Sequence, residues 1–290
     1  MKKLFFLITL CVPFLISAQE IKNHYKIYDV KKAKVITLDD IVNDMKSANV
    51  LFFGEEHNDS IGHFLESELL KKMASVYPSK VALTLEMFHT DIQPVLDEYL
   101  GGIISEKNLI KEARAWNNYK DYRPMIEFAK VNKIDVVAGN GAARYSNAVT
   151  RDGLTTLTKL PSTSKAFIAP LPIDTATGRY YDKFIETLGG HNMGSMKIYQ
   201  TQNFWDATMA WSIAKYTKKN KDTKILQVNG RFHSDERLGT LAKLNKYAPK
   251  LKILNISCFS ADDFIEPDWN KYKQLGDYII LTDPAIKKTF

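Results

Sequence analysis

The chain has 290 residues, of which 45% are hydrophobic and 25% are charged. This composition is typical of a globular protein with one large core, and it excludes a disordered or fibrous protein. The formal net charge is +7, but lysine and arginine are scattered along the chain, which predicts no nucleic-acid partner.

Residues 1–18 have the pattern of a secretory signal peptide. Lys2 and Lys3 precede an apolar run over residues 4–16, and the small residue Ala18 provides a cleavage site. The apolar run is short for a helix that spans a bilayer. We therefore expect an exported protein that is periplasmic, associated with the outer membrane, or secreted.

Cys11 raises the alternative of a lipid anchor. The modified cysteine of a bacterial lipoprotein normally follows a small residue, whereas Leu10 precedes Cys11, so cleavage without lipidation is the favoured prediction. Removal of residues 1–18 leaves Cys258 as the remaining cysteine. Because one thiol cannot form an internal disulfide, the fold is expected to depend on its core alone.

Over residues 19–290, short β-branched and apolar runs alternate with helical patterns. The expected strands are 34–37, 50–53, 81–85, 135–138, 224–228, 252–256 and 278–281, and the expected helices are 61–77, 91–100, 122–132, 199–217 and 237–247. This alternation predicts a single α/β domain with a mostly parallel sheet flanked by helices. The proline-rich and less regular segment 142–194 is expected to form a helical insertion or subdomain.

Polar side chains follow several of these strands. In chain order they are Glu55, Glu56 and His57, then Glu86, then Asn140, and finally Asn229, Arg231 and His233. The carboxyl ends of parallel strands open on one edge of a sheet, where ligands bind. We therefore expect these side chains to meet at that edge.

Two of the strand ends share the form Gly-x-x-His. Gly54 precedes His57, and Gly230 precedes His233, by the same spacing. A glycine at this place permits a tight turn, after which the histidine can return over the sheet edge. One such motif is common by chance, but two that flank Glu86 in the chain predict a paired site.

Imidazole and carboxylate groups can bind a divalent metal, exchange protons with a substrate or water, or orient a polar ligand. For a catalytic site, the expected residues are Glu55, His57, Glu86 and His233. For a metal site, the expected ligands are His57, His233 and Glu86. The structural alternative is a buried polar network that only fixes the sheet edge.

Four further residues are candidates for a supporting role. Gln202 and Asp206 lie four residues apart on an expected helix and would share one face. If that face is the cleft, they orient the paired histidines; otherwise they are an ordinary helix pair. His63, on the helix after the first Gly-x-x-His motif, and Asn140 complete this set.

The residues that begin the helix at 61–77 include several carboxylates. Glu55 and Glu56 are adjacent, so one is expected to enter the site while the other caps this helix. Asp59 is also a good helix-start residue, and capping is its preferred role.

With these motifs in place, the sequence resembles the ChaN-like haem-binding uptake family, which belongs to a larger group with Tiki and TraB proteins and erythromycin esterases. The resemblance is carried by "GEEHND" with His63, by "LEM" at Glu86, by "YRPMIEFAKVNKIDVVAGN" after Trp116, by "AARYSNAVTRDGL", by "YQTQNFWDATMA" and by "VNGRFH". Where the family commonly has Asp directly after the first histidine, this chain has Asn58.

The resemblance implies an exported protein that binds haem and takes part in iron acquisition. Its implied partners are haem, a second copy of the chain through cofacial haems held by tyrosine, and an outer-membrane haem receptor. Tyrosinate is a suitable ligand for ferric haem. The candidates are Tyr145, with Arg144 to pair with a propionate, and Tyr180 and Tyr181, with Arg179 beside them.

The same resemblance implies a second function. Tiki proteases and erythromycin esterases are hydrolases, so the paired Gly-x-x-His site is also a candidate for metal-dependent or His/Glu-based hydrolysis. Haem binding is the favoured prediction and hydrolysis the alternative, because a shared fold does not carry an activity with it.

Overall fold

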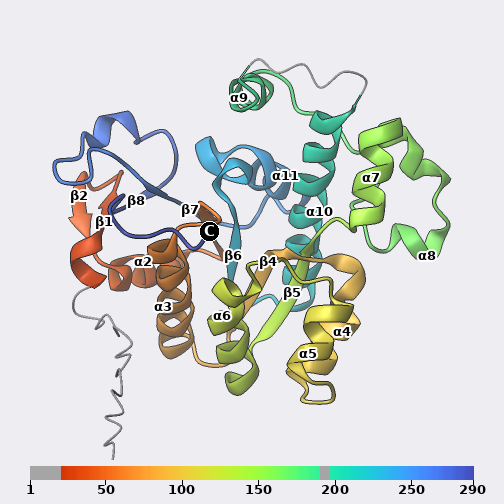
Figure 1. Cartoon of the computed structure of the whole chain (residues 1–290), viewed down its shortest axis with the longest axis horizontal. Helices are drawn as coiled ribbons and strands as arrows, with labels where there is room; N and C mark the ends of the chain where they lie inside the picture. The colour runs from red at the N-terminus through yellow and green to blue at the C-terminus, as the bar shows by residue number, and fades with distance from the viewer. Residues whose placement is uncertain (1–20, 190–195) are drawn as a thin grey trace, which may run out of the picture.

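The computed structural model describes residues 21–189 and 196–290, which form a sheet covered by helices (Figure 1). The expected signal peptide, the possible lipidation site Cys11 and residues 190–194 of the expected insertion lie outside the described residues. No helix in the described part of the chain is long and apolar enough to cross a membrane.

One mostly parallel sheet organises the described residues. Its strands are β1 (Tyr25–Asp29), β2 (Lys34–Ile36), β3 (Val50–Glu55), β4 (Val81–His89), β5 (Asp135–Asn140), β6 (Lys224–Gly230), β7 (Ile253–Ser260) and β8 (Tyr278–Thr282). Their order is β2-β1-β8-β7-β3-β6-β4-β5. Strands β3 to β8 are parallel, and β1 is antiparallel to both β2 and β8. The predicted α/β class is confirmed.

Helices cover both faces of this sheet. They are α2 (Leu38–Asp44), α3 (Ser60–Val76), α4 (Gln93–Leu100), α5 (Glu106–Glu112), α6 (Tyr119–Asn132), α7 (Ala143–Asp152), α8 (Ser162–Lys165), α9 (Arg179–Thr187), α10 (Ile198–Lys219) and α11 (Gly239–Tyr247). In β3, Leu51 and Phe53 pack in one apolar cluster with α3 and α6, while Val50 and Phe52 pack in another with α10 and α11. Residues 50–53 of this central strand are all apolar because both of its faces are covered.

The expected strands are present, but several extend beyond the predicted ends. The strands β3, β4, β5 and β6 include Glu55, Glu86, Asn140 and Asn229, which the sequence placed after the strands. The parallel ladder pairs Gly54 with Asn229, so the backbone pairing continues past the last apolar residue. Strand β1 was missed because it is short and contains one aliphatic residue, Ile27, so it lacks the apolar run by which the other strands were predicted.

The segment expected as an insertion contains α7, α8 and α9 within its described residues. Tyr145 and Val149 of α7 share a separate apolar cluster with Ile168 and with Phe204 of α10. Figure 1 shows α7 and α8 together beside α10, whereas α9 lies apart from α7 and α8. Tyr180 of α9 donates to Asp206 of α10. This part of the chain therefore packs on α10 rather than on the sheet directly.

Candidate functional site

The pleat of the sheet sends the side chains of Glu55 and Glu86 to opposite faces. Glu55 follows Leu51 and Phe53 at intervals of two, so it faces α3 and α6, while Glu86 follows Ala82 toward α10 and α11. The two glutamates are only 2% and 6% exposed. The polar cluster therefore occupies both sides of the sheet edge.

His57 is held from the side of α6. Its Nδ1 donates to Oε1 of Glu55 at 2.8 Å, and the hydroxyl of Tyr122 donates to the same oxygen at 2.8 Å. The Trp116 ring lies edge-on to the imidazole, with 5.2 Å between the centroids. Because Glu55 occupies Nδ1, the other nitrogen of His57 is the one that faces Gly230.

His233 is held in the same manner from the side of α10. Its Nδ1 donates to Oδ1 of Asp206 at 2.7 Å, and the same oxygen accepts from the Thr240 hydroxyl at 2.9 Å. The hydroxyl of Tyr180 donates to Oδ2 of this fully buried aspartate. The amide of Gln202 lies 3.0 Å from Nδ1 of His233 and donates to Tyr180.

Glu86 lies beside both arrangements. Its Oε2 accepts from the backbone amide of Gly230 at 2.7 Å, and its Oε1 lies 3.5 Å from Nε2 of His233. Each histidine thus has one carboxylate on Nδ1, from Glu55 or Asp206, and shares Glu86 as a neighbouring charge.

These carboxylates set the protonation of the imidazoles. Burial lowers the pKa of His57, but the bond to Glu55 and the charge of Glu86 outweigh burial and raise it. For His233, burial acts in the same direction, and the charges of Glu86 and Asp206 overcome it and raise the pKa to about 10. His233 is therefore an imidazolium at neutral pH, and its charge lowers the pKa of Glu86 against the effect of burial.

The two glycines of the Gly-x-x-His motifs make room for each other's turns. A Cβ at Gly54 would lie 2.7 Å from Oγ of Ser234 and 3.0 Å from Cα of Arg231. A Cβ at Gly230 would lie 2.7 Å from Nε2 of His57. The expectation that Gly54 forms a turn is wrong, because it lies within β3; its small size instead lets the neighbouring turn approach.

A cavity of about 490 Å³ opens beside the histidines. Its lining residues are Glu55, Glu56, His57, Asn58, Gln202, Gly230, Arg231, Phe232, His233, Lys288 and Phe290. The C-terminal residues lie over this region because the amide of Thr289 donates to the carbonyl oxygen of Asn58 at 2.9 Å. The cavity therefore combines imidazoles, carboxylates, cations and two phenylalanine rings.

Of the supporting residues expected from sequence, Gln202 and Asp206 lie beside His233. His63 lies behind His57, with its Nε2 3.1 Å from the carbonyl oxygen of His57. Asn140 remains apart, because its side chain accepts from the amide of Gly141 within its own turn.

The residues expected to bind haem occupy different environments. Tyr145 is buried on α7, with Arg144 stacked over its ring at 4.4 Å and paired with Asp91. Tyr180 is buried against Asp206, and burial followed by the aspartate charge raises the pKa of its hydroxyl well above the usual value. Tyr181, the next residue on α9, is 45% exposed.

Arg179, at the start of α9, forms ion pairs with two carboxylates. Its Nη1 lies 2.7 Å from Oε1 of Glu186, and its Nε lies 2.8 Å from Oε2 of Glu236. A propionate would therefore have to compete with these partners for the guanidinium.

Sequence reasoning missed Tyr122 and Glu66. Glu66 is completely buried on α3, and its Oε2 lies 3.4 Å from Nδ1 of His63. The spacing of His63 and Glu66, three residues apart on one helix, was the available signal. In the described residues, Glu55, His63 and Glu66 form a group of possible metal ligands within 4.8 Å of one another, whereas His57, His233 and Glu86 do not.

The structure confirms one of the two helix-capping expectations and contradicts the other. Asp59 caps α3, since its Oδ1 accepts from the amides of Ile61 and Gly62 at 3.0 Å each. Glu55 enters the site as expected for one of the two adjacent glutamates. The expectation that the other caps α3 is wrong, because Glu56 faces Ser260 and lines the cavity.

Chemically, the site offers two imidazoles whose orientation is fixed by buried carboxylates, with a third carboxylate between them. Such groups can donate protons, or bind an anionic or carbonyl oxygen, at the mouth of the cavity. They can equally serve as a buried polar network that satisfies its own charges.

Comparisons with known proteins identify the family. The model of the family described as haem-binding uptake, Tiki superfamily, ChaN matches residues 41–244. No curated protein matches the chain. A solved structure described as cofacial haem binding to ChaN of Campylobacter jejuni is similar in fold, with a TM-score of 0.68 and 17% identity over 90% of this chain and 97% of that chain.

Two other solved structures show weaker likeness. The type III effector HopBA1 has a TM-score of 0.49 and 12% identity, over 85% of this chain and 93% of that chain. A mutant of the erythromycin esterase EreC in its open conformation has a TM-score of 0.48 and 11% identity, over 90% of this chain and 83% of that chain. Since the family model covers more than half of the sequence, the chain belongs to the ChaN family of haem-binding uptake proteins in the Tiki superfamily.

Proposed function

We propose that this protein binds ferric haem outside the cytoplasm and serves haem and iron acquisition. The observation that carries the proposal is the family match over residues 41–244. The similarity in fold to a ChaN described with cofacial haem supports it. The match favours haem binding over the hydrolase alternative, because the family is described by haem-binding uptake.

The surface best suited to a porphyrin is an aromatic face beside the cavity, made of Tyr181, Phe184, Tyr199 and Phe232. Tyr199 lies 5.0 Å from Tyr181 and 4.9 Å from Phe184 between ring centroids, and Phe184 lies 6.4 Å from Phe232. Ile185, on the same helix as Tyr181, is 40% exposed. Tyr181 is exposed and the other three rings are half-buried. A flat apolar macrocycle packs well on such rings and on neighbouring aliphatic groups.

Tyr181 is the iron ligand that fits this surface. Tyr181 is exposed, whereas the buried Tyr180 donates its hydroxyl hydrogen bond to Asp206 and Tyr145 is buried under Arg144. Phenolate oxygen is a suitable axial ligand for ferric iron, and the bound iron would favour loss of the hydroxyl proton.

Cations for the haem propionates lie at the border of the aromatic face and the cavity. Arg231 and Lys288 line the cavity. Arg231 retains one ion pair, with Asp235 at 2.8 Å, and its guanidinium has further donors. Charge-assisted bonds from these side chains would hold the carboxylate edge of the macrocycle.

A titration with ferric haem tests the assignment. The unsubstituted protein is expected to show saturable binding with a shifted Soret band, and Tyr181→Phe is expected to weaken binding about tenfold or more and remove the phenolate charge-transfer band. Tyr199→Phe is the matched control from the same aromatic face, since its hydroxyl donates to the Ala176 carbonyl. Equal spectra and affinities for all three proteins would reject Tyr181 as the ligand.

Three finer elements belong to the same proposal: export by the signal peptide, pairing of two copies through cofacial haems, and delivery to an outer-membrane haem receptor. The word cofacial in the description of the Campylobacter jejuni ChaN supports the pairing. Light scattering should give a dimer mass in the presence of haem and a monomer mass for Tyr181→Phe. N-terminal sequencing of the exported protein should begin at Gln19, and a start at Met1 would contradict export by cleavage.

A further inference from the structure

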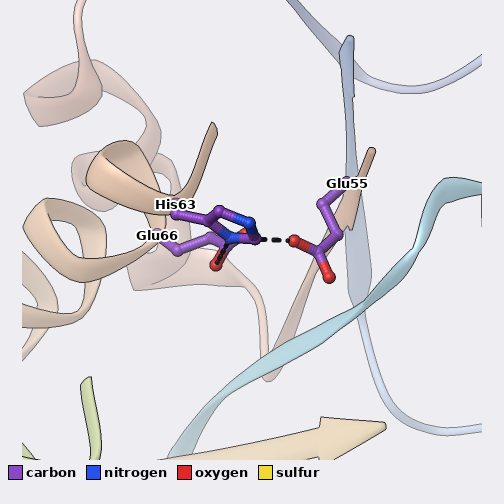
Figure 2. Close-up of side chains that lie close together, drawn as sticks. All are labelled: Glu55, His63 and Glu66. Atoms are coloured by element: carbon purple, nitrogen blue, oxygen red, sulfur yellow. Dashed lines mark hydrogen bonds and ion pairs between the residues drawn. The ribbon is translucent and has the colours of Figure 1, made fainter. Parts of the chain in front are cut away.

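Behind His57, a second group of ligating side chains is enclosed between β3 and α3. Figure 2 shows Glu55, His63 and Glu66 converging from these two elements. Nδ1 of His63 lies 3.2 Å from Oε2 of Glu55 and 3.4 Å from Oε2 of Glu66. The three residues are 2%, 6% and 0% exposed, so bulk water does not solvate them.

Two carboxylate oxygens in this group lack a hydrogen bond. Oε2 of Glu55 and Oε1 of Glu66 are buried and have no hydrogen-bond partner among the described residues. Oδ2 of Asp121 is also buried without a hydrogen bond, and it lies 3.9 Å from Nε2 of His63. Oε2 of Glu55 has only the ion pair with Nδ1 of His63 at 3.2 Å, whereas Oε1 of Glu66 has no polar partner among the described residues. A carboxylate oxygen without a partner is costly to bury, so Oε1 of Glu66 indicates that the pocket accommodates a further cation.

The spacing suits a transition metal. Ligand atoms about 2.1 Å from a tetrahedral metal lie about 3.4 Å from one another. The separations of 3.2 and 3.4 Å around Nδ1 of His63 agree with that value. A donor set of one imidazole nitrogen and two carboxylates matches Zn²⁺, Mn²⁺ or Fe²⁺, whereas Ca²⁺ and Mg²⁺ prefer oxygen alone.

We propose that Glu55, His63 and Glu66 form a buried binding site for a divalent first-row transition metal. The site is separate from the haem surface on α9, and it shares Glu55 with the cavity but includes neither His57 nor His233. Glu55 also accepts a hydrogen bond from Nδ1 of His57, so the metal would fix the carboxylate that orients His57. Occupancy of the site therefore controls the position of an imidazole at the cavity.

The competing arrangement is a proton held between the two glutamates, with His63 as the only cation. The probes that separate the two are Zn²⁺, Mn²⁺ and Fe²⁺, each added singly to the purified protein after a chelator has removed bound metals. Elemental analysis is expected to find one metal per chain, and metal addition is expected to raise the Tm. Failure of all three metals to bind would overturn the proposal in favour of the shared proton.

Variants locate the bound metal. Glu66→Gln keeps the side-chain size and is expected to weaken Zn²⁺ binding by about 100-fold or more. Glu56→Gln is the matched control, because Glu56 follows Glu55 in the sequence but faces Ser260. The Zn²⁺ affinity of this variant is expected to be unchanged. Full Zn²⁺ affinity in Glu66→Gln would overturn the site.

X-ray absorption of the Zn²⁺-loaded unsubstituted protein gives an answer that does not depend on how the variants fold. The proposed site contains one imidazole, so the spectrum should fit one imidazole among oxygen ligands. Two imidazoles would place the metal at His57 and His233 and would overturn the proposal.

Discussion

Gly230 has no room for a side chain because of His57: a Cβ built on Gly230 would lie 2.7 Å from Nε2 of that histidine. The backbone at Gly230, with φ of −53° and ψ of 132°, is one that alanine adopts readily. Any effect of a substitution there is therefore steric, and it acts on the position of His57.

Replacing Gly230 by alanine is expected to destabilise the protein by about 1–3 kcal/mol and to displace the His57 ring. Urea unfolding measures the first effect, and the NMR shifts of the imidazole report the second. Gly62→Ala, on α3, is the control, where the nearest atom would be 3.3 Å away and stability should change by less than about 1 kcal/mol. Equal stability of both variants would show that the contact at Gly230 relaxes freely.

The ion pairs of His233 with Glu86 and with Asp206 should make stability depend on pH. The folded-state pKa of His233 is about 10, above its unfolded value near 6.5, so the stabilisation is complete below pH 6.5 and is lost as the pH rises through 10. The free energy of unfolding should therefore fall across this range.

Asp206→Asn isolates the contribution of the ion pair between His233 and Asp206, because the substitution removes the carboxylate charge and keeps the side-chain size. Urea unfolding at several pH values should show a shallower decline for the variant than for the unsubstituted protein. Parallel pH profiles for the two proteins would mean that the aspartate does not stabilise the imidazolium.

Tyr180 and Tyr181 are adjacent in sequence but should respond differently to loss of the hydroxyl. Tyr180→Phe leaves Oδ2 of buried Asp206 without its tyrosine donor, so a loss of about 1.5–3 kcal/mol is expected. Tyr181→Phe, at an exposed position, should change stability by less than about 0.5 kcal/mol. Thermal unfolding of both without haem makes the comparison, and a larger loss for Tyr181→Phe would contradict the assigned environments.

Asp59 ties the start of α3 to the sheet. Its Oδ1 caps the helix and its Oδ2 accepts from the hydroxyl of Thr282 at 2.6 Å. Asp59→Ala removes both interactions, and a loss of about 2–4 kcal/mol is expected. Glu56→Ala should cost less than about 0.5 kcal/mol because Glu56 does not cap the helix. Chemical denaturation measures the free energy of unfolding of both variants. Similar losses for the two would mean that Asp59 is not the residue that caps the helix.

The sheet and the gathering of polar residues could be predicted because both follow from local patterns. Apolar runs define parallel strands, and parallel strands end on one edge, which brings Glu55, His57, Glu86 and His233 to the same region. The interval of four between Gln202 and Asp206 gave a shared helix face, and the packing of α10 determines that this face meets His233.

The partners that hold these residues could not be predicted, because they come from elements distant in the chain. Tyr122 reaches Glu55 only because α6 packs beside α3, and Tyr180 reaches Asp206 only because α9 lies near α10. The part played by Gly54 depends on the turn after a neighbouring strand. Tertiary contacts of this kind leave no local signal in the sequence.

The most direct test of haem binding is a crystal structure of the protein loaded with ferric haem, with the iron located by anomalous scattering. The proposal predicts iron bonded to the phenolate oxygen of Tyr181, with the macrocycle on the aromatic face. Protein that retains no haem, or iron bonded to Tyr145 or to the cavity histidines, would contradict it.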